Sequence, residues 1–168
     1  MTTWKKNMDN NNVHFSSKSD EWETPDEFFD QLNDEFKFDA DLCCTEQNSK
    51  CELWVNKLEN FVGFIKEGYY KKHKTYWMNP PYSRGLQKEM VGYAQELSTL
   101  GKTVVCLLPA RTDTKLWHEF IWDGATHKPR TGVEVRLIKG RIKFELNGVT
   151  KDPAPFPSAI VIFHACNV

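Results

Sequence analysis

The sequence contains no apolar run that approaches the roughly 20 residues needed for a membrane-spanning helix. Its first residues are polar and show no secretory signal, so we expect a cytoplasmic protein with reduced thiols. A charge excess is also missing, since 22 Lys and Arg face 23 Asp and Glu and leave a net charge of -1. Binding to nucleic acid would therefore depend on local basic clusters, not on the charge of the whole chain.

The spacing typical of metal-binding motifs is missing as well. Cys43, Cys44 and Cys51 lie near one another, but adjacent cysteines lack the usual two-residue spacing between ligands. No pair of histidines nearby completes a zinc site. We therefore expect no metal and interpret these cysteines as small, buried apolar residues.

The length and composition predict one folded domain. A chain of 168 residues that is 40% hydrophobic and 13% aromatic can bury a single core. Residues 1–18 are rich in Asn, Ser and Lys without helical or strand periodicity, so we expect a flexible N-terminal arm. Residues 19–168 are then expected to form the single domain.

Several segments have the periodicity of regular structure. Thr24, Pro25 and Glu27 form a capping-box pattern with Thr24 as N-cap, which predicts a helix to about Phe36. Residues 45–74 show no sustained period. The other expected elements are short strands at 38–43 and 75–78, helices at 85–100 and 113–120, a buried strand at 103–108, alternating strands at 134–138 and 141–145 before the turn dipeptide 147–148, and a buried strand at 158–163.

This order of elements predicts a three-layer α/β sandwich with a mostly parallel sheet and a late antiparallel pair of strands. Ligands of such sheets bind at the carboxyl ends of the parallel strands. Asp41 and Asn79 each stand where a strand is expected to end. We therefore place the candidate site around these two residues.

The sequence Asn79-Pro80-Pro81-Tyr82 directly follows the apolar strand at 75–78. Two prolines stiffen the backbone, so an amide oxygen and a neighbouring carbonyl could accept hydrogen bonds from a planar amino group while the ring of Tyr82 stacks on a base. This interpretation requires a cleft beside the two side chains. Alternatively, the prolines simply end the strand and Tyr82 belongs to the core, and enzymes acting on glutamine side chains or RNA bases use the same four residues.

Six stretches, in this order, carry a family resemblance: 21–25 with Phe28, 38–44, 77–82, 106–114 with Trp117 and His118, 139–144, and 154–161. Together they resemble the phage and prophage family of DNA N-6-adenine methyltransferases, often called Dam-like. The likeness covers most of residues 20–164.

The resemblance implies a Rossmann-like methyltransferase fold and S-adenosylmethionine as cofactor. It also implies methyl transfer to the 6-amino group of an adenine flipped out of double-stranded DNA, as part of phage or prophage DNA modification and evasion of restriction. By this likeness Asn79, Pro80, Pro81 and Tyr82 are the catalytic residues. The residues expected at the cofactor are Trp22, Thr24, Pro25, Asp39, Asp41 and Cys43.

The loop after Asp41 departs from the wider methyltransferase pattern because it lacks the glycines that let a cofactor approach the backbone. The acidic residue that would hold the cofactor ribose is not evident, and Glu52 and Glu59 are both candidates. His118 beside Trp117 is interpreted as packing. Phe156, in the stiff segment 154–157, is expected to form a wall of the base pocket.

The expected DNA-binding residues are Arg111, Asp113, Arg141 and Lys143. Arg111 could bind a phosphate or pair with Asp113, and we favour the phosphate. Residues 45–74 and 127–132 are the expected readers of DNA sequence. Two basic clusters could form a binding face or be ordinary solvated charges: Lys66, Lys71, Lys72 and Lys74, and Lys128, Arg130, Arg136, Lys139, Arg141 and Lys143.

Two alternatives remain open from the sequence. The first is an amino-methyltransferase that acts on cytosine, RNA or a protein glutamine. The second is a DNA-binding protein that keeps the fold but has little or no catalytic activity, as the glycine-poor loop would allow. The recognition sequence and the oligomeric state are not determined by the sequence.

Overall fold

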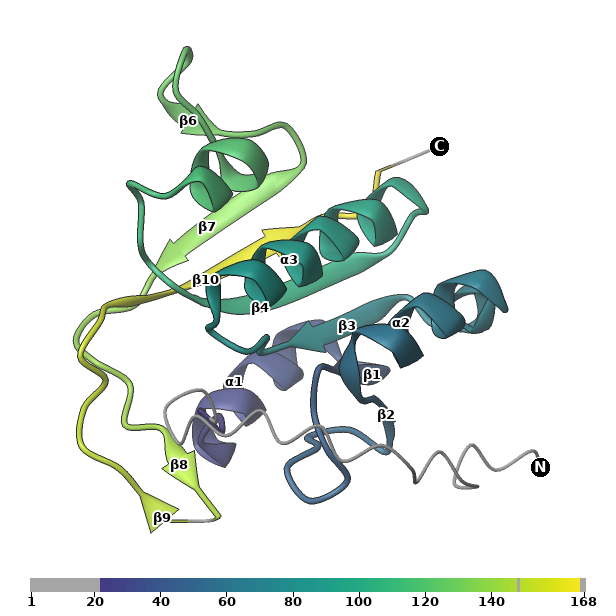
Figure 1. Cartoon of the computed structure of the whole chain (residues 1–168), viewed down its shortest axis with the longest axis horizontal. Helices are drawn as coiled ribbons and strands as arrows, with labels where there is room; N and C mark the ends of the chain where they lie inside the picture. Colours follow the sequence, from purple (N-terminus) through teal and green to yellow (C-terminus); the bar gives the residue numbers. More distant parts are fainter. Residues whose placement is uncertain (1–21, 148, 167–168) are drawn as a thin grey trace.

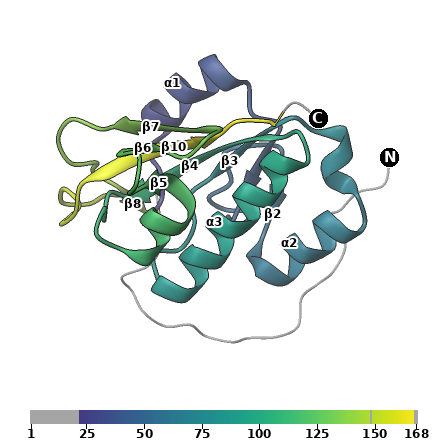
Figure 2. The same cartoon turned by 90° about the horizontal axis from the view of Figure 1, so that it is seen from above.

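The computed structural model describes residues 22–147 and 149–166, without the side chains of 57–60 and 84. The flexible arm expected at 1–18 lies outside these residues. A central sheet separates helix α1 (Asp26–Phe36) on one face from α2 (Lys57–Lys66) and α3 (Arg84–Thr99) on the other (Figures 1 and 2). The three layers and the mostly parallel sheet confirm the expected α/β sandwich and fit a Rossmann-like fold.

The sheet has six strands in the order β2-β1-β3-β4-β10-β7. They are β1 (Ala40–Leu42), β2 (Leu53–Val55), β3 (Thr75–Met78), β4 (Thr103–Pro109), β7 (Val133–Leu137) and β10 (Ser158–Phe163). Strands β2, β1, β3 and β4 pair in parallel, and β10 pairs antiparallel with both β4 and β7. All strands except β10 therefore run in the same direction, and β10 is inserted between β4 and β7.

Alternating side chains of the central strands fill two separate cores. Tyr76 and Met78 of β3 join the core beneath α2 and α3, whereas Trp77 between them joins the core beneath α1. Strand β4 is buried on both faces, as its continuous apolar sequence predicts. The same burial along β10 makes β4 and β10 the centre of the fold.

The start of α1 differs from the expected capping box. Pro25 occupies the N-cap position, and no side chain caps the helix. The hydroxyl of Thr24 instead accepts a hydrogen bond from Asn79 Nδ2 at 3.1 Å. A long-range partner has thus replaced the local one, because the end of β3 lies directly against the chain before α1.

The segment without sequence periodicity is largely regular. It contains β2, α2 and the 3₁₀ turn η1 (Tyr69–Lys72). The expected helix at 113–120 is a π-helical segment, η2 (Trp117–Ile121), which continues into the short hairpin of β5 (Trp122–Asp123) and β6 (Lys128–Pro129).

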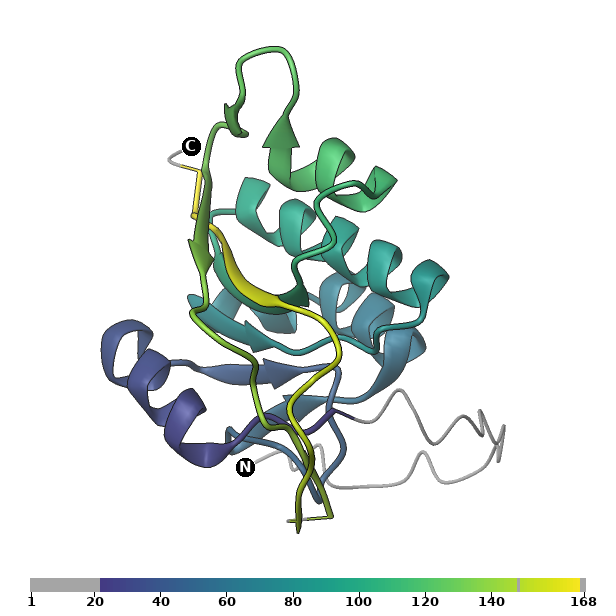
Figure 3. The ribbon, with the colours of Figure 1, turned by 90° about the vertical axis from the view of Figure 1, so that its left-hand side faces the viewer.

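The expected strand at 141–145 is wrong. Strand β7 pairs with β10, while residues 138–144 and 151–157 form two extended arms that run side by side (Figure 3). The arms end in a two-stranded ribbon of β8 (Glu145–Leu146) and β9 (Val149–Thr150).

Among the helices of residues 22–147 and 149–166, none combines the length and apolar composition that a membrane-spanning segment needs.

Candidate active site

The carboxyl ends of β1, β3 and β4 lie at one edge of the sheet, which we call the carboxyl edge. Asn79 begins the loop after β3, and Asp41 lies one residue before the end of β1. Arg111 follows β4 closely at the same edge. The rule for parallel sheets thus brings together residues that are far apart in sequence.

The amide of Asn79 is hydrogen-bonded on both sides. Its Nδ2 donates to the carbonyl of Trp22 at 2.5 Å and to Thr24 Oγ1 at 3.1 Å, while its Oδ1 accepts from the hydroxyl of Tyr82 at 3.0 Å. Because a backbone carbonyl only accepts, the Trp22 contact fixes the amide nitrogen on that side. The oxygen therefore faces Tyr82 and keeps one lone pair for a further donor.

The two prolines after Asn79 limit how its loop can move. Pro80 is buried and Pro81 is half-buried, and neither has an N–H to pair with another segment. No donor within the described part of the chain bonds the Pro80 carbonyl. The loop therefore presents two acceptors: the Asn79 amide oxygen, which also accepts from Tyr82, and the Pro80 carbonyl, which has no partner among the described residues.

The ring of Tyr82 is enclosed by other aromatic rings. It is 6% exposed, with Trp22 at 6.5 Å, Phe156 at 5.4 Å and Phe144 at 6.1 Å between ring centroids. Burial raises the pKa of its hydroxyl well above the usual range, and the charge of Arg111 opposes this only in part. The ring of Tyr82 thus belongs to the core, which is the alternative that the sequence left open, and the exposed stacking surface expected beside Asn79 is wrong for this arrangement. We call Trp22, Tyr82, Phe144 and Phe156 the aromatic cluster.

Asp41 is a buried carboxyl group, only 3% exposed. The backbone N–H of Lys50 donates to its Oδ2 at 2.8 Å, and burial nevertheless raises its pKa to about 7. The next loop turns at Cys43, whose φ of 71° is left-handed. A residue other than glycine therefore makes this turn, at a cost of roughly 1 to 2 kcal/mol.

Asp39 does not lie at this site. It precedes β1, at the amino ends of the strands, where its Oδ2 accepts from the backbone N–H of Lys74 at 2.7 Å and of Thr75 at 3.0 Å. Partial burial opposes ionisation, but these hydrogen bonds outweigh it and hold the pKa of Asp39 below its usual value. The expected cofactor role of Asp39 is replaced by a structural role at the opposite edge of the sheet.

The expected DNA-binding residues are all exposed. Arg111 lies over the ring of Phe156 at 5.6 Å, so it borders the aromatic cluster. It forms no ion pair with Asp113, and within the described residues neither side chain has another charged partner. Arg141 and Lys143 project from the arm that leads to β8.

Two members of the basic clusters have structural partners instead. Arg136 holds Glu35 of α1 through two hydrogen bonds of 2.6 and 2.7 Å, and it also contacts Glu134. Arg130 donates to the carbonyl of His118 at 2.6 Å. The remaining basic residues on the arm, Lys139, Arg141 and Lys143, have no ion pair among the described residues.

Sequence reasoning missed two contributors to the site. Phe144 packs against both Trp22 and Tyr82, and Lys50 supplies the N–H that holds Asp41. The alternation of Ile142 and Phe144 with basic residues was the available signal for Phe144. Phe156, from the segment 154–157 that is expected to wall the base pocket, contacts Tyr82. Of the two ribose candidates, Glu52 is exposed and the side chain of Glu59 lies outside the described residues.

One cavity lies away from the loop after β3. A surface cavity of about 350 Å³ is lined by residues of α3 and by Phe120, and includes none of the expected site residues. Within the described residues, no group of three or more His, Cys, Asp or Glu is arranged to hold a metal ion.

Comparisons with known proteins agree on one family. Residues 12–166 match the family described as DNA N-6-adenine-methyltransferase (Dam). A DNA N-6-adenine-methyltransferase of Haemophilus phage HP1 (strain HP1c1) is 31% identical over 151 residues, covering 88% of this chain and 80% of the relative. The protein of the same name from Escherichia phage T1 is 32% identical over 101 residues, covering 60% of this chain and 40% of the relative. No solved structure matches the chain significantly.

Proposed function

Because this chain belongs to the DNA N-6-adenine-methyltransferase (Dam) family and is an adenine-specific DNA methyltransferase, we propose that Asn79 and Pro80 hold the 6-amino group of an adenine flipped out of duplex DNA. The observation that carries this proposal is the amide of Asn79, fixed by Trp22 and Tyr82 at the carboxyl end of β3 with one lone pair left over.

The proposed role of these acceptors is to orient the amino nitrogen. Hydrogen bonds from the amino group to Asn79 Oδ1 and the Pro80 carbonyl draw its nitrogen out of conjugation with the purine ring. The lone pair of the nitrogen is then free to accept a methyl group. Bound S-adenosylmethionine would supply this group, and the nitrogen would exchange one N–H bond for the new bond to carbon, with the proton released to solvent. Proximity and orientation supply most of the rate, so no basic side chain is needed.

S-adenosylmethionine is the methyl donor that we propose, and it supplies a methyl group on a positively charged sulfur. Asp41 fits a role toward such a ligand, since a buried carboxylate with a raised pKa gains from a cationic or hydrogen-bond-donating partner. The left-handed turn at Cys43 directs the next loop along the same edge. Trp22 and Thr24 contact Asn79, and together with Pro25 they are proposed to lie beside the methionine end of the ligand.

Entry of a base requires the aromatic cluster to open. Trp22 and Phe156 cover the ring of Tyr82, so an adenine can stack on this ring only when one of them moves away. Trp22 is the better candidate because the ring of Phe156 is also covered by Arg111, which lies 5.6 Å from its centroid. We therefore propose that the base takes the place of the Trp22 ring.

The fold supports the same reading, since the single reversed strand β10 between β4 and β7 completes an otherwise parallel sheet of the Rossmann-like kind. Both relatives are phage proteins. Modification of phage DNA, and with it evasion of restriction, is the setting that we propose for the methyl mark.

The proposal is tested by methyl transfer from tritium-labelled S-adenosylmethionine to unmethylated duplex DNA, followed by digestion and separation of the nucleosides. Label in N6-methyladenine is the expected result. Label in methylcytosine would point to another amino-methyltransferase. So would label in RNA or protein, supplied as acceptors in parallel reactions, when DNA remains unlabelled. A folded protein that binds DNA but transfers no label would be the inactive DNA-binding protein.

A further inference from the structure

The β8–β9 ribbon stands apart from the layers of the fold. Its two arms are joined by hydrogen bonds from Lys151 N to the Phe144 carbonyl at 2.7 Å and from Ala154 N to the Ile142 carbonyl at 2.9 Å. They carry the ribbon beyond the carboxyl edge, away from α2 and α3 (Figures 1 and 3). This segment therefore has the shape of a projecting finger, which we define as residues 138–147 and 149–157.

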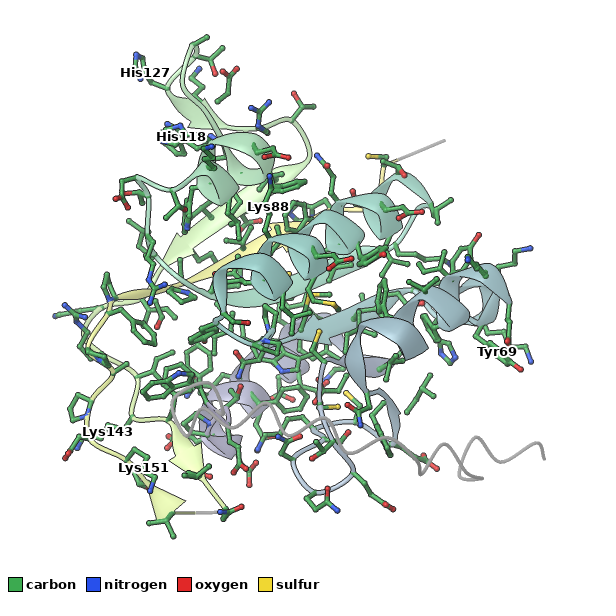
Figure 4. All side chains as sticks on the ribbon, in the orientation of Figure 1. Tyr69, Lys88, His118, His127, Lys143 and Lys151 are labelled. Carbon is green, nitrogen blue, oxygen red and sulfur yellow. The ribbon has the colours of Figure 1, made fainter. Side chains whose placement is uncertain are left out.

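The finger separates apolar and basic side chains onto two sides. Phe144 of the aromatic cluster and Ile142 are buried in the core beneath α1, whereas Arg141 and Lys143 alternate with them and are exposed. Four basic side chains of the finger are exposed and have no ion pair among the described residues: Lys139, Arg141, Lys143 and Lys151. Lys143 and Lys151 project from the two arms in Figure 4. The acidic residues of the finger are Glu145 and Asp152.

The end of the ribbon carries residue types that contact base edges. Asn147 and Thr150 are exposed, and Val149 is 60% exposed although it is apolar. An Asn amide matches the donor and acceptor of adenine in the major groove, and an apolar side chain matches the methyl group of thymine. Val149 pairs with Leu146 in the ribbon, and its side chain remains available for contact with a partner.

We infer that the finger enters the major groove of the substrate DNA, with Asn147 and Val149 facing base edges and the four basic residues on phosphates. A two-stranded ribbon is one of the two protein shapes that this groove admits. This inference rests on the proposed function, because it assigns sequence reading to a separate part of the same DNA-binding face. The segments that we expected to read DNA, 45–74 and 127–132, lack this combination of a narrow ribbon, basic arms and a polar tip beside the site.

The finger is also joined to the site that it would serve. Glu23 and Glu145 exchange backbone hydrogen bonds of 3.1 and 2.9 Å, so the ribbon is paired with the residue between Trp22 and Thr24. Phe144 on the same arm packs against Trp22 and Tyr82. Binding of DNA by the finger would therefore act on the segment that covers Asn79.

Two double variants of the full chain test the finger. Arg141→Ala with Lys143→Ala should reduce the slope of log affinity against log salt concentration by about 2, because two phosphate contacts are lost. Asn147→Ala with Val149→Ala should leave this slope unchanged and reduce the preference for the favoured site over other adenine sites by about 10-fold. The slope is measured by fluorescence anisotropy on a labelled duplex, and the preference by sequencing methyladenine in unmethylated genomic DNA.

Lys66→Ala with Lys72→Ala is the matched control, since it removes two exposed cations near Tyr69, at the opposite end of the molecule in Figure 4. The inference is overturned if this control lowers the salt slope as much as the arm variant, or if the tip variant keeps the site preference of the parent chain. If the parent chain transfers no methyl group, the proposed function fails, while the salt slopes still decide whether the arms contact DNA.

Discussion

The two edges of the central sheet use the same kinds of side chain for opposite purposes. Asp39 at the amino edge accepts two backbone hydrogen bonds that lower its pKa, whereas Asp41, two residues later, is buried with a pKa raised to about 7. The amides differ in the same way. Asn33 Oδ1 accepts from the backbone of Phe38 at 2.9 Å, whereas Asn79 is held by groups that leave its oxygen room for another donor.

The contrast assigns the polar groups at the amino edge to stability and those at the carboxyl edge to the proposed function, although only a few residues of each strand lie between the two edges. Groups at the amino edge have protein partners and stabilise the joins between elements. At the carboxyl edge burial opposes the charge of Asp41, and Asn79 Oδ1 keeps room for a further donor, which fits the ligand proposed there. Variants at matched positions of the two edges can therefore break or sharpen the comparison.

The largest effect is expected for Asn79→Ala. Loss of the acceptor for the adenine amino group should lower kcat for methyl transfer by about 10³-fold or more, with cofactor affinity changed by less than about 2-fold. Radiolabel transfer and calorimetric titration measure the two quantities. Asn33→Ala is the amide control and should lose stability without a change in kcat. Comparable turnover by Asn79→Ala would refute the role of this residue.

The next effect is expected for Asp41→Asn, which removes a buried charge. Cofactor affinity should fall by roughly 10-fold or more, since a hydrogen-bonded charge interaction contributes about 1.5 to 3 kcal/mol. Above pH 7 the free energy of unfolding should rise, by on the order of 2 kcal/mol, because the folded state no longer holds a carboxylate out of water. Calorimetry and urea unfolding at pH 8 measure these changes.

The pH dependence of Asp41 has a definite sign. Its pKa is higher in the folded state, about 7, than the ordinary value of 3.8. Between these two values the folded chain binds more protons than the unfolded chain, so its contribution lowers stability as pH rises and is constant above pH 7. Asp41→Asn should flatten this part of the stability profile. A variant that is less stable than the parent at pH 8 would contradict the unfavourable burial of the charge.

A smaller effect is expected for Tyr82→Phe, which removes one hydroxyl and keeps the ring. The Tyr82 hydroxyl orients Asn79 Oδ1, so kcat should fall by about 10-fold, corresponding to a hydrogen bond of roughly 1.4 kcal/mol. KM for DNA should change little, because stacking on the ring is retained. Steady-state kinetics measure both parameters. A rise in KM for DNA with kcat unchanged would instead assign the hydroxyl to DNA binding.

The smallest effect is expected for Asp39→Ala at the amino edge. Stability should fall by about 1 kcal/mol, since hydrogen bonds to Lys74 and Thr75 are lost at an exposed site, and kcat should be unchanged. The pKa of Asp39 is lowered on folding, so its contribution is present above pH 4 and is lost as pH falls through the folded-state pKa. Urea unfolding at pH 7 and pH 3 measures this, and a large loss of cofactor binding would return Asp39 to the site.

The accuracy of the sequence-based predictions follows the range of the interactions involved. Strands β3, β4 and β10 and helix α3 were predicted closely because their apolar patterns are local and strong. Thr24 does not cap α1 and Asp39 does not lie at the carboxyl edge, because their partners, Asn79 and Thr75, are distant in sequence. The strand expected at 141–145 was wrong because the alternating pattern places Ile142 and Phe144 in the core with Tyr82, and residues 141–144 do not pair as a strand of the sheet.

The sequence by itself determined the α/β layers, the proline-stiffened Asn79 at the end of a buried strand, and the family. Only the tertiary structure decided that Trp22 covers Tyr82, that the two carboxyl groups flanking Ala40 serve opposite edges, and that residues 138–147 and 149–157 project as a finger. The physical reason is that periodicity reports which face of an element is apolar, whereas the choice of partner is made when distant segments compete for the same buried surface.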